Sequence, residues 1–271
     1  MRVNMRLDFI KMHGAGNDYI YVVCLEREVE NPEEIAKTLS KRRFSVGADG
    51  LVLIEASKIA DAKMRIFNAD GSEAKMCGNA LRCVGKLLYE SAFLKKSHIK
   101  IETQSGIRTV FLTVKDKKVG LVTADMGRAE VGENFTFEVE GERYEMLGVN
   151  VGNEHQVTFS ESVDTFELDK IGWCFEKNPR YAGGVNTEFC TVLGKNHLKI
   201  RVFERGSGET LACGTGACAA VVAATLAGHC AQDDIVTVKL RGGDLTVIYR
   251  ANGEVELSGS VKTVYEGTFE I

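Results

Sequence analysis

The chain has 271 residues, a net charge of −4, a hydrophobic content of 44% and only two prolines. This length can hold two domains, each with its own core. Without a basic excess, neither nucleic acid nor an anionic membrane is an expected partner. The N-terminus has no apolar run of signal-peptide length, and the most apolar segment, residues 217–227, is too short to cross a bilayer, so we expect a cytoplasmic protein.

The eight cysteines are expected to be mainly reduced thiols in that compartment. No C-x-x-C occurs, and neither the 77/83 nor the 213/218 pair has the spacing of a zinc site. The five histidines form no ligand cluster in the sequence, and only His155, beside Asn153, is expected near a site. We therefore expect no metal site.

The first half of the chain reads mainly as strands linked by turns. Alternating and β-branched patterns predict strands at residues 7–14, 19–24, 51–56, 61–67, 99–104, 107–114 and 119–126. A short helix is predicted over 32–40, with Asn31 as its cap and Pro32 at its first position. After Cys77, apolar residues recur at helical spacing, so this cysteine should lie at or just before a first helical turn.

The second half repeats this order. Strands are predicted at residues 135–139, 144–149, 156–160, 187–193, 198–203, 236–240, 244–250 and 254–259, with a last strand ending at 271. A helix is expected between 167 and 177, with Trp173 and Phe175 in the core. The segment 214–228 is apolar on all sides, which predicts a helix buried inside its own sheet. The fold class is therefore α+β, with two similar domains.

An internal repeat relates the two halves. The offset between Cys77 and Cys213 is 213 − 77 = 136 residues, half the length of the chain. The same offset relates five residues of each half, Arg65, Phe67, Glu73, Cys77 and Gly78 aligning with Arg201, Phe203, Glu209, Cys213 and Gly214. It also relates Gly16-Asn17 to Gly152-Asn153 and Gly47 to Gly183. A duplication that keeps glycines for turns and cysteines as small core residues would explain these matches without a site.

A sharper interpretation is that each half offers one cysteine at a helix N-terminus, on either side of one cleft. A helix N-terminus binds a carboxylate and lowers the pKa of a nearby thiol. One cysteine, as thiolate, could take the α-proton of an amino acid while the other, as thiol, returns a proton to the opposite face. The sulfurs would then stand roughly 7 Å apart. This geometry inverts a stereocentre.

The motifs around both cysteines resemble those of diaminopimelate epimerases. The first motif is Asn68-Ala69-Asp70-Gly71-Ser72-Glu73 leading to Cys77-Gly78-Asn79, and the second is Glu204-Arg205-Gly206-Ser207-Gly208-Glu209-Thr210 leading to Cys213-Gly214-Thr215. The early Met12-His13-Gly14-Ala15-Gly16-Asn17-Asp18 is similar to the opening motif of that family. The resemblance runs essentially from end to end.

The resemblance implies a cofactor-independent enzyme that interconverts LL- and meso-diaminopimelate in lysine and peptidoglycan precursor synthesis. It implies two pseudosymmetric domains, each a mainly antiparallel sheet curled around a central helix, with the active site in the cleft between them. The last strand returns to the first domain. We place the N-terminal domain at 1–122 with 263–271, and the C-terminal domain at 123–262.

Site residues follow from the resemblance by motif position. Cys77 and Cys213 are the expected acid/base pair. The expected substrate-binding residues are Asn17, Asn68, Gly78, Asn79, Asn153, Asn186, Glu204, Arg205, Gly214 and Thr215. Among them, Gly78-Asn79 and Gly214-Thr215 would bind the reacting carboxylate. Glu204 would meet the remote ammonium and Arg205 the remote carboxylate of the substrate.

Two positions depart from the family pattern, and both lie near the expected specificity end. Glu154 stands where the family commonly has Pro, and Gly50 stands where some members carry a substrate-contacting Gln. These departures bear on substrate identity and not on the two-thiol chemistry.

Several alternatives stay open at this point. One is a racemase of the same fold acting on another amino acid, such as histidine or proline; proline racemases usually have His where Asn79 stands. Another is a non-catalytic binding protein or a thiol-redox protein. A nucleotide site is not expected, because neither a P-loop nor a G-x-G-x-x-G motif is present. The oligomeric state is left open, a homodimer included.

Overall fold

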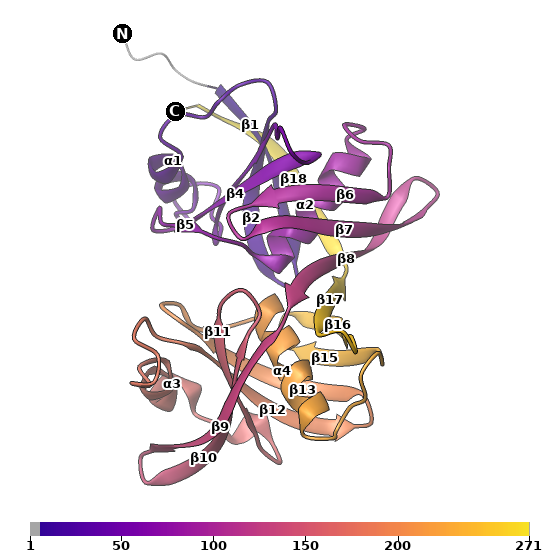
Figure 1. The fold of residues 1–271 in the computed structure, drawn as a ribbon. Coiled ribbons are helices and arrows are strands. Elements are labelled where there is room, and N and C mark those ends of the chain that lie inside the picture. Colours follow the sequence, from indigo (N-terminus) through magenta and orange to yellow (C-terminus); the bar gives the residue numbers. More distant parts are fainter. Residues whose placement is uncertain (1–5, 271) are drawn as a thin grey trace. The chain divides into compact units, whose positions relative to one another are not determined.

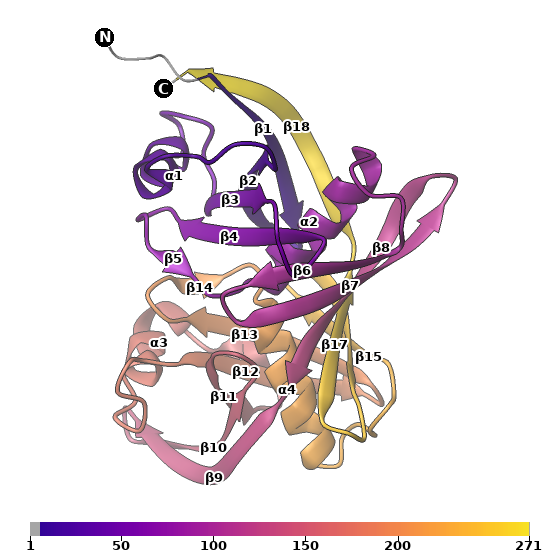
Figure 2. The ribbon, with the colours of Figure 1, turned by 45° about the horizontal axis from the view of Figure 1, so that its top comes forward.

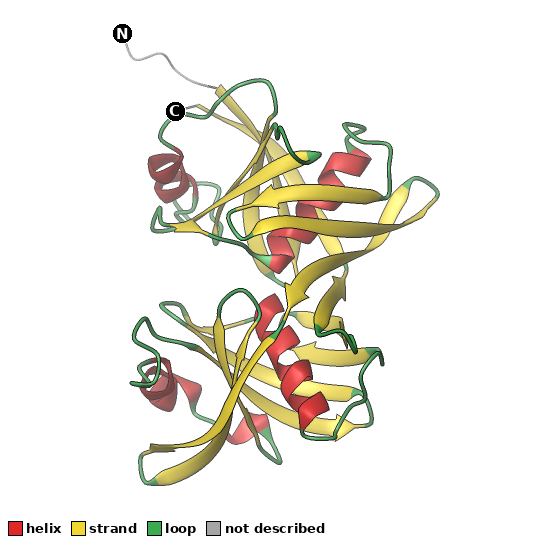
Figure 3. Cartoon of the chain, in the orientation of Figure 1, coloured by secondary structure: helices red, strands yellow, loops and turns green. Residues whose placement is uncertain are grey.

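A computed structural model describes residues 6–270 and divides the chain into two compact units (Figure 1). Unit 1 contains the described residues up to Ala124 and from Gly259 onward, and unit 2 is Asp125–Ser258. Strands predominate in both units, with a few helices among them (Figure 3). Between residues 6 and 270, no helix has the length and apolarity needed to cross a membrane.

Unit 1 is built on one curved sheet. Its strands are β1 (Arg6–Gly14), β2 (Asn17–Cys24), β3 (Gly50–Glu55), β4 (Ala62–Asn68), β5 (Glu73–Ala74), β6 (His98–Thr103), β7 (Gly106–Lys115), β8 (Lys118–Arg128, which ends in unit 2) and β18 (Val261–Glu270). They pair in the order β18-β1-β2-β3-β4-β6-β7-β8, with β5 also on β4. Only β2–β3 and β4–β6 are parallel, and each parallel pair is joined by a crossover containing a helix, as parallel strands require.

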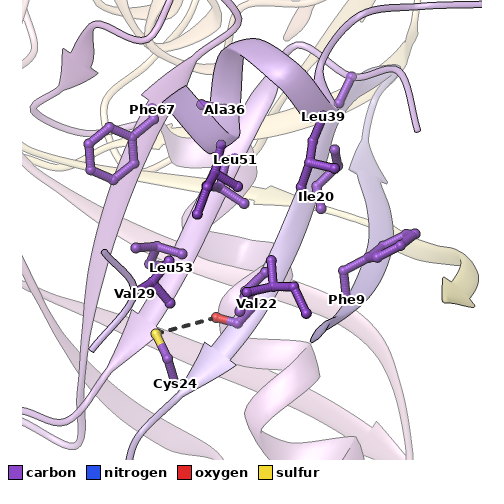
Figure 4. Close-up of a cluster of buried hydrophobic side chains, with 13 residues drawn as sticks. Phe9, Ile20, Val22, Cys24, Val29, Ala36, Leu39, Leu51, Leu53 and Phe67 are labelled. Carbon is purple, nitrogen blue, oxygen red and sulfur yellow. Dashed lines mark hydrogen bonds between the residues drawn. The ribbon is translucent and has the colours of Figure 1, made fainter. Parts of the chain in front are cut away.

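Two helices complete unit 1. Helix α2 (Gly78–Glu90) packs on β1, β7 and β18, enclosed by the curved sheet (Figure 2). Helix α1 (Pro32–Leu39) packs on β3 and β4. Its Ala36 and Leu39 join a core with Ile20, Leu51 and Phe67 (Figure 4). This core fixes the strands that carry the loops near Cys77.

Unit 2 has the same plan. Its strands are β9 (Glu130–Val139), β10 (Glu142–Asn150), β11 (Glu154–Phe159), β12 (Asn186–Gly194), β13 (His197–Glu204), β14 (Gly208–Thr210), β15 (Val236–Leu240), β16 (Gly243–Tyr249) and β17 (Glu254–Gly259). The order is β9-β10-β11-β12-β13-β15-β16-β17, and again two pairs, β11–β12 and β13–β15, are parallel. A 3-10 turn (Val163–Thr165) and helix α3 (Leu168–Glu176) lie between β11 and β12.

Helix α4 (Gly214–Leu226) is the central helix of unit 2. All its residues from Gly214 to Ala224 are buried, and it packs on β10, β11, β12, β13, β15 and β16. The predicted helix that is apolar all round and buried in its own sheet is therefore confirmed. An aromatic cluster that includes Phe175 and Phe189 forms a second core beneath α3.

The strand registers show the same offset of 136 residues as the sequence repeat. Tyr19 faces Gly50 in β2–β3, and His155 faces Asn186 in β11–β12, each partner 136 residues further on (155 − 19 = 136; 186 − 50 = 136). Helices α2 and α4 start and end at the same offset (214 − 78 = 136; 226 − 90 = 136). The two units are thus copies of one α+β domain, as the repeat predicted.

Two local predictions need correction. Trp173 is 44% exposed and does not belong to the core, whereas Phe175 is fully buried. The buried face of α3 passes through Gly172, where a Cβ would meet the ring of Phe203 at 2.1 Å. Trp173 lies beside that face and makes a T-shaped contact with Phe203, with ring centroids 4.9 Å apart. Asn31 does occupy the cap position of α1, but in a left-handed conformation (φ 51°) and without a side-chain cap hydrogen bond.

Candidate active site

Each unit places one cysteine at the N-cap of its central helix. Cys77 precedes α2 and Cys213 precedes α4, both in extended backbone (φ −142° and −117°). The first amides of an α-helix have no acceptor within the helix and carry positive partial charge, so both cysteines stand where an anion is favoured. The two positions predicted for the acid/base residues therefore have equivalent local structure.

A charged pair holds the turn before each cysteine. Arg65 on β4 donates Nε to Glu73 Oε1 at 2.7 Å, and Arg201 on β13 donates Nε to Glu209 Oε1 at 2.7 Å. Each pair closes the short ladder that leads the chain back toward the central helix. The aligned Arg and Glu residues of the repeat are thus scaffolding for the cysteine turns.

Cys77 is partly exposed and lies among amide side chains of unit 1. Its thiol donates to Asn17 Oδ1 at 3.4 Å, and Asn79 Nδ2 reaches the same oxygen at 3.4 Å. Asn17 in turn donates Nδ2 to Asp49 Oδ2 at 2.8 Å. The structure therefore brings three of the predicted residues together: Cys77, Asn17 and Asn79.

Cys213 is buried at the start of α4. Its Sγ accepts the N–H of Gly216 at 3.4 Å and lies 3.3 Å from Thr215 Oγ1. Burial raises the pKa of the Cys213 thiol well above its ordinary value, and the negative charges of Glu204 and Glu188 add to this. Hydrogen bonds from Thr215 and Gly216 act in the opposite direction. The thiol is therefore the favoured form of Cys213.

Glu204 lies at the end of β13, close enough to Cys213 for each to change the pKa of the other. Burial raises the pKa of Glu204, although the Thr210 hydroxyl donates a hydrogen bond to its carboxylate. A cation bound beside Glu204 and Cys213 would favour the charged forms of both.

Arg205 and Asn186 are joined through the backbone. The N–H of Arg205 donates to Asn186 Oδ1 at 2.9 Å, and Asn186 Nδ2 donates to the Glu154 carbonyl at 3.2 Å. The guanidinium of Arg205 is exposed, with one bond to the Gly183 carbonyl at 3.4 Å. Its remaining donors suit a carboxylate ligand.

The other predicted residues are placed as follows. Asn68, at the end of β4, bonds within its own turn to Ser72 Oγ at 3.0 Å and has no described bond to the Cys77 group. Gly78 and Gly214 are buried first residues of α2 and α4. Asn153 Oδ1 lies 3.1 Å from His155 Nε2.

Two residues near the cysteines were not predicted. Glu188, on β12, is fully buried and its Oε1 lies 2.8 Å from His155 Nδ1. A lone glutamate within the apolar strand at 187–193 was a signal that could have identified it. Asp49, bonded to Asn17, was hidden in a Gly-Ala-Asp-Gly segment that reads as a turn.

The two departures from the family pattern have different structural contexts. At Gly50, a Cβ would stand 2.1 Å from the carbonyl oxygen of Phe67, so this backbone has no room for a side chain there. Glu154 is exposed and accepts a bond from Asn150 Nδ2 at 2.9 Å. Among the described residues, no three His, Cys, Asp or Glu side chains are grouped as metal ligands.

Comparison with known proteins identifies the family. The diaminopimelate epimerase family model matches residues 9–132 and 147–264. The diaminopimelate epimerase of Acetivibrio thermocellus is 46% identical, over 97% of this chain and 98% of its own, and that of Methanococcus maripaludis is 46% identical, over 98% of this chain and all of its own.

Solved structures of much lower identity share the fold. A hydroxyproline epimerase from Agrobacterium vitis, with trans-4-hydroxy-L-proline bound, is 15% identical with a TM-score of 0.76, covering 100% of this chain and 94% of its own. A PhzF-family phenazine biosynthesis protein from Bacillus anthracis is 17% identical with a TM-score of 0.78, covering 98% of this chain and 100% of its own. The family match over both units and the close full-length relatives show that the chain belongs to the diaminopimelate epimerase family.

Proposed function

We propose that the chain interconverts LL- and meso-diaminopimelate by a two-base mechanism in which Cys77 and Cys213 act on opposite faces of one α-carbon. The activity belongs to lysine biosynthesis and supplies a peptidoglycan precursor. The observation that supports it most is the repetition, in the same register, of a cysteine at the N-cap of each central helix. A two-base inversion of a stereocentre needs one acid/base group on each face of the carbon. An enzyme that uses a single thiol would not need this repetition.

The proton inventory of the reaction balances within the two thiols. One cysteine, as thiolate, forms an S–H bond as the Cα–H bond breaks, and the electron pair stays on the substrate as a carbanion conjugated with its carboxylate. The other cysteine gives its S–H proton to the opposite face and is left as thiolate. The carboxylate oxygens are stabilised as charge builds on them by the first amides of α2 and α4, those of Gly78, Asn79, Gly214 and Thr215.

The thiolate at Cys213 forms with substrate in place. Burial raises the pKa of this thiol and so favours its protonated form. The substrate carries ammonium groups, and a cation near Cys213 and Glu204 favours the charged forms of both side chains. As the thiolate forms, the Cys213 proton leaves to solvent, and the thiolate then takes the α-proton of the substrate.

Recognition of the far end of the substrate is assigned to Glu204 and Arg205. Glu204 binds the remote ammonium, and the exposed guanidinium of Arg205 binds the remote carboxylate. Asn186 positions Arg205 through its backbone bond, and Asn153 and Asn68 complete the polar lining. By the repeat, Glu204 and Arg205 align with Asn68 and Ala69, so charge is added in one half only.

The test is conversion of LL-diaminopimelate to the meso form by the purified chain under reducing conditions, followed by chiral separation. Histidine and proline serve as parallel substrates. Conversion of diaminopimelate alone supports the proposal. Conversion of another amino acid alone would keep the two cysteines and reject the role of Glu204 and Arg205, and no conversion of any would favour a binding protein.

A further inference from the structure

We infer that Asp49 is a positioning residue that turns the carboxamide oxygen of Asn17 toward Cys77 and so holds Cys77 as the protonated thiol, ready to donate. The inference rests on the proposed acid/base role of Cys77. It adds what holds one of the two cysteines in its protonated form. Hydrogen bonds link four polar side chains of unit 1, which we call the amide relay: Asp49, Asn17, Asn79 and Arg82.

The Asp49 end of the amide relay fixes the orientation of Asn17. Asp49 Oδ2 accepts from Asn17 Nδ2 at 2.8 Å and from the N–H of Asp18 at 3.0 Å, while its Oδ1 accepts from Arg42 Nη2 at 2.9 Å. A carboxylate with these three donors can only accept. The Asn17 atom that faces it must therefore be the nitrogen, which leaves the oxygen on the side of Cys77.

The Arg82 end fixes the orientation of Asn79 independently. The side chain of Arg82 is fully buried, and its Nη2 donates to Asn79 Oδ1. A guanidinium only donates, so the oxygen of Asn79 must face Arg82 and its nitrogen must face Asn17 Oδ1, at 3.4 Å. The two charged ends thus impose the same direction, with every donor pointing from Arg82 toward Asp49.

The consequence for Cys77 is a preference for the thiol. Its Sγ lies 3.4 Å from Asn17 Oδ1, an oxygen that can accept an S–H but offers only lone pairs to a thiolate. A hydrogen bond made to the neutral form of an acid disfavours its ionised form. Asn17 cannot rotate to present its nitrogen without breaking the bond to Asp49.

The second copy of the site lacks this device. Asn153 aligns with Asn17 (153 − 17 = 136), but the residue aligned with Asp49 is Val185 (49 + 136 = 185). The oxygen of Asn153 lies 3.1 Å from His155 Nε2, and Cys213 Sγ accepts the N–H of Gly216. Cys77 therefore faces an amide oxygen, whereas Cys213 lies beside both a donor, the N–H of Gly216, and an acceptor, the Glu204 carboxylate. The restraint from Asp49 therefore acts on Cys77 and has no counterpart at Cys213.

The test measures the reactivity of Cys77 directly. Wild type and the Asp49→Ala variant are treated with iodoacetamide at neutral pH, and peptide mass spectrometry follows alkylation of Cys77, with the exposed Cys174 in the same chain as the reference. Asp49→Ala frees the Asn17 amide to turn its nitrogen toward the sulfur. We expect Cys77 alkylation to rise about fivefold relative to Cys174, the effect of one neutral hydrogen bond.

Two control variants distinguish the effect of turning the Asn17 amide from the effect of loosening the loop that contains Asp49. Asp49→Asn keeps an oxygen that accepts from Asn17 and should restore a rate within about twofold of wild type. Arg42→Gln removes the guanidinium from Asp49 Oδ1 and from Asp18 but leaves the bond to Asn17, so it loosens the same loop without freeing the amide. Its Cys77 rate should also stay near wild type.

The result that would overturn the inference is an unchanged Cys77 rate in Asp49→Ala, or an equal rise in either control. Failure of Asp49→Ala to fold would show as alkylation of the buried Cys24 and a changed circular dichroism spectrum. In that case Asn17→Ala replaces it. This variant removes the acceptor itself and should raise the Cys77 rate likewise, and no rise contradicts the inference. Alkylation needs no substrate, so failure here is distinct from failure of the epimerase activity.

Discussion

Arg201 and Glu209 form a two-pronged ion pair, with Nε–Oε1 at 2.7 Å and Nη2–Oε2 at 2.8 Å, that ties β13 to β14 just before Cys213. Its counterpart in unit 1 is Arg65 with Glu73, at 2.7 and 3.1 Å. Arg201 also donates to the carbonyls of Val163 and Phe166, so it additionally anchors the segment before α3. Both units therefore use the same kind of Arg–Glu pair to hold the turn before the cysteine.

Replacing Arg201 should destabilise the protein in a pH-dependent way. The hydrogen bond from Arg201 lowers the pKa of Glu209 in the folded state. The stabilisation from this bond is therefore fully present above the unfolded-state pKa of the carboxyl. It is lost as the pH falls through the lowered folded-state pKa. We expect Arg201→Met to lower the free energy of unfolding by about 1.5–3 kcal/mol at neutral pH. Urea melts at neutral and acidic pH measure it.

Arg65→Met is the matched control for that variant. Its pair is more exposed, with side chains 27% and 24% accessible against 17% and 8% for Arg201 and Glu209, so its loss should be smaller. Equal losses in the two variants, or a loss in Arg201→Met that persists undiminished in acid, would contradict the electrostatic explanation.

Glu204 should lower the stability of the protein while serving its proposed function. Burial raises its folded-state pKa, so the stabilising effect of this group is present below its unfolded-state pKa and is lost as pH rises through the folded-state pKa. We therefore expect Glu204→Gln to raise the melting temperature by about 2–4 °C at neutral pH and not in acid. The same variant should lower kcat/KM for diaminopimelate, as functional sites that trade stability for activity do. Calorimetry at two pH values and a rate assay test these expectations. A lower melting temperature of Glu204→Gln at neutral pH would contradict the expected gain in stability.

Gly216 is expected to be indispensable despite its place inside a helix. A Cβ there would lie 2.5 Å from Glu188 Oε1, so Gly216→Ala should push Glu188 away from His155 and reduce kcat. Alanine is intrinsically better than glycine in a helix by about 1 kcal/mol, so a site without a clash would gain stability. We expect a net loss of about 1–3 kcal/mol. Gly194→Ala, where no atom lies within 4 Å of the added Cβ, is the control and should leave activity unchanged.

The sequence was sufficient to predict the plan of the fold and the positions of the two cysteines. The offset of 136 residues appears again in the strand registers, because one pattern of alternating and apolar segments specifies both units. The position of Trp173 was predicted wrongly, since its apolar character does not say which face of α3 meets the sheet and Gly172 marks that face only through the close packing of Phe203.

The contacts that Asp49 and Glu188 make could not be predicted from the sequence for a different reason. Each acts through a contact with a residue more than 30 positions away, Asp49 with Asn17 and Glu188 with His155. Parallel pairing of β2 with β3 and of β11 with β12 creates both contacts. Local patterns report turn chemistry and burial, and do not report which strand ends become neighbours.

The most direct test of the two-base account is exchange of the substrate α-proton in deuterated water, followed by NMR, with LL-diaminopimelate and a reductant present. Wild type should exchange the proton and epimerise the substrate, and both Cys77→Ser and Cys213→Ser should slow epimerisation by at least about 100-fold. A single variant that still epimerises at the wild-type rate would show that its cysteine is not one of the two bases, and would contradict the account.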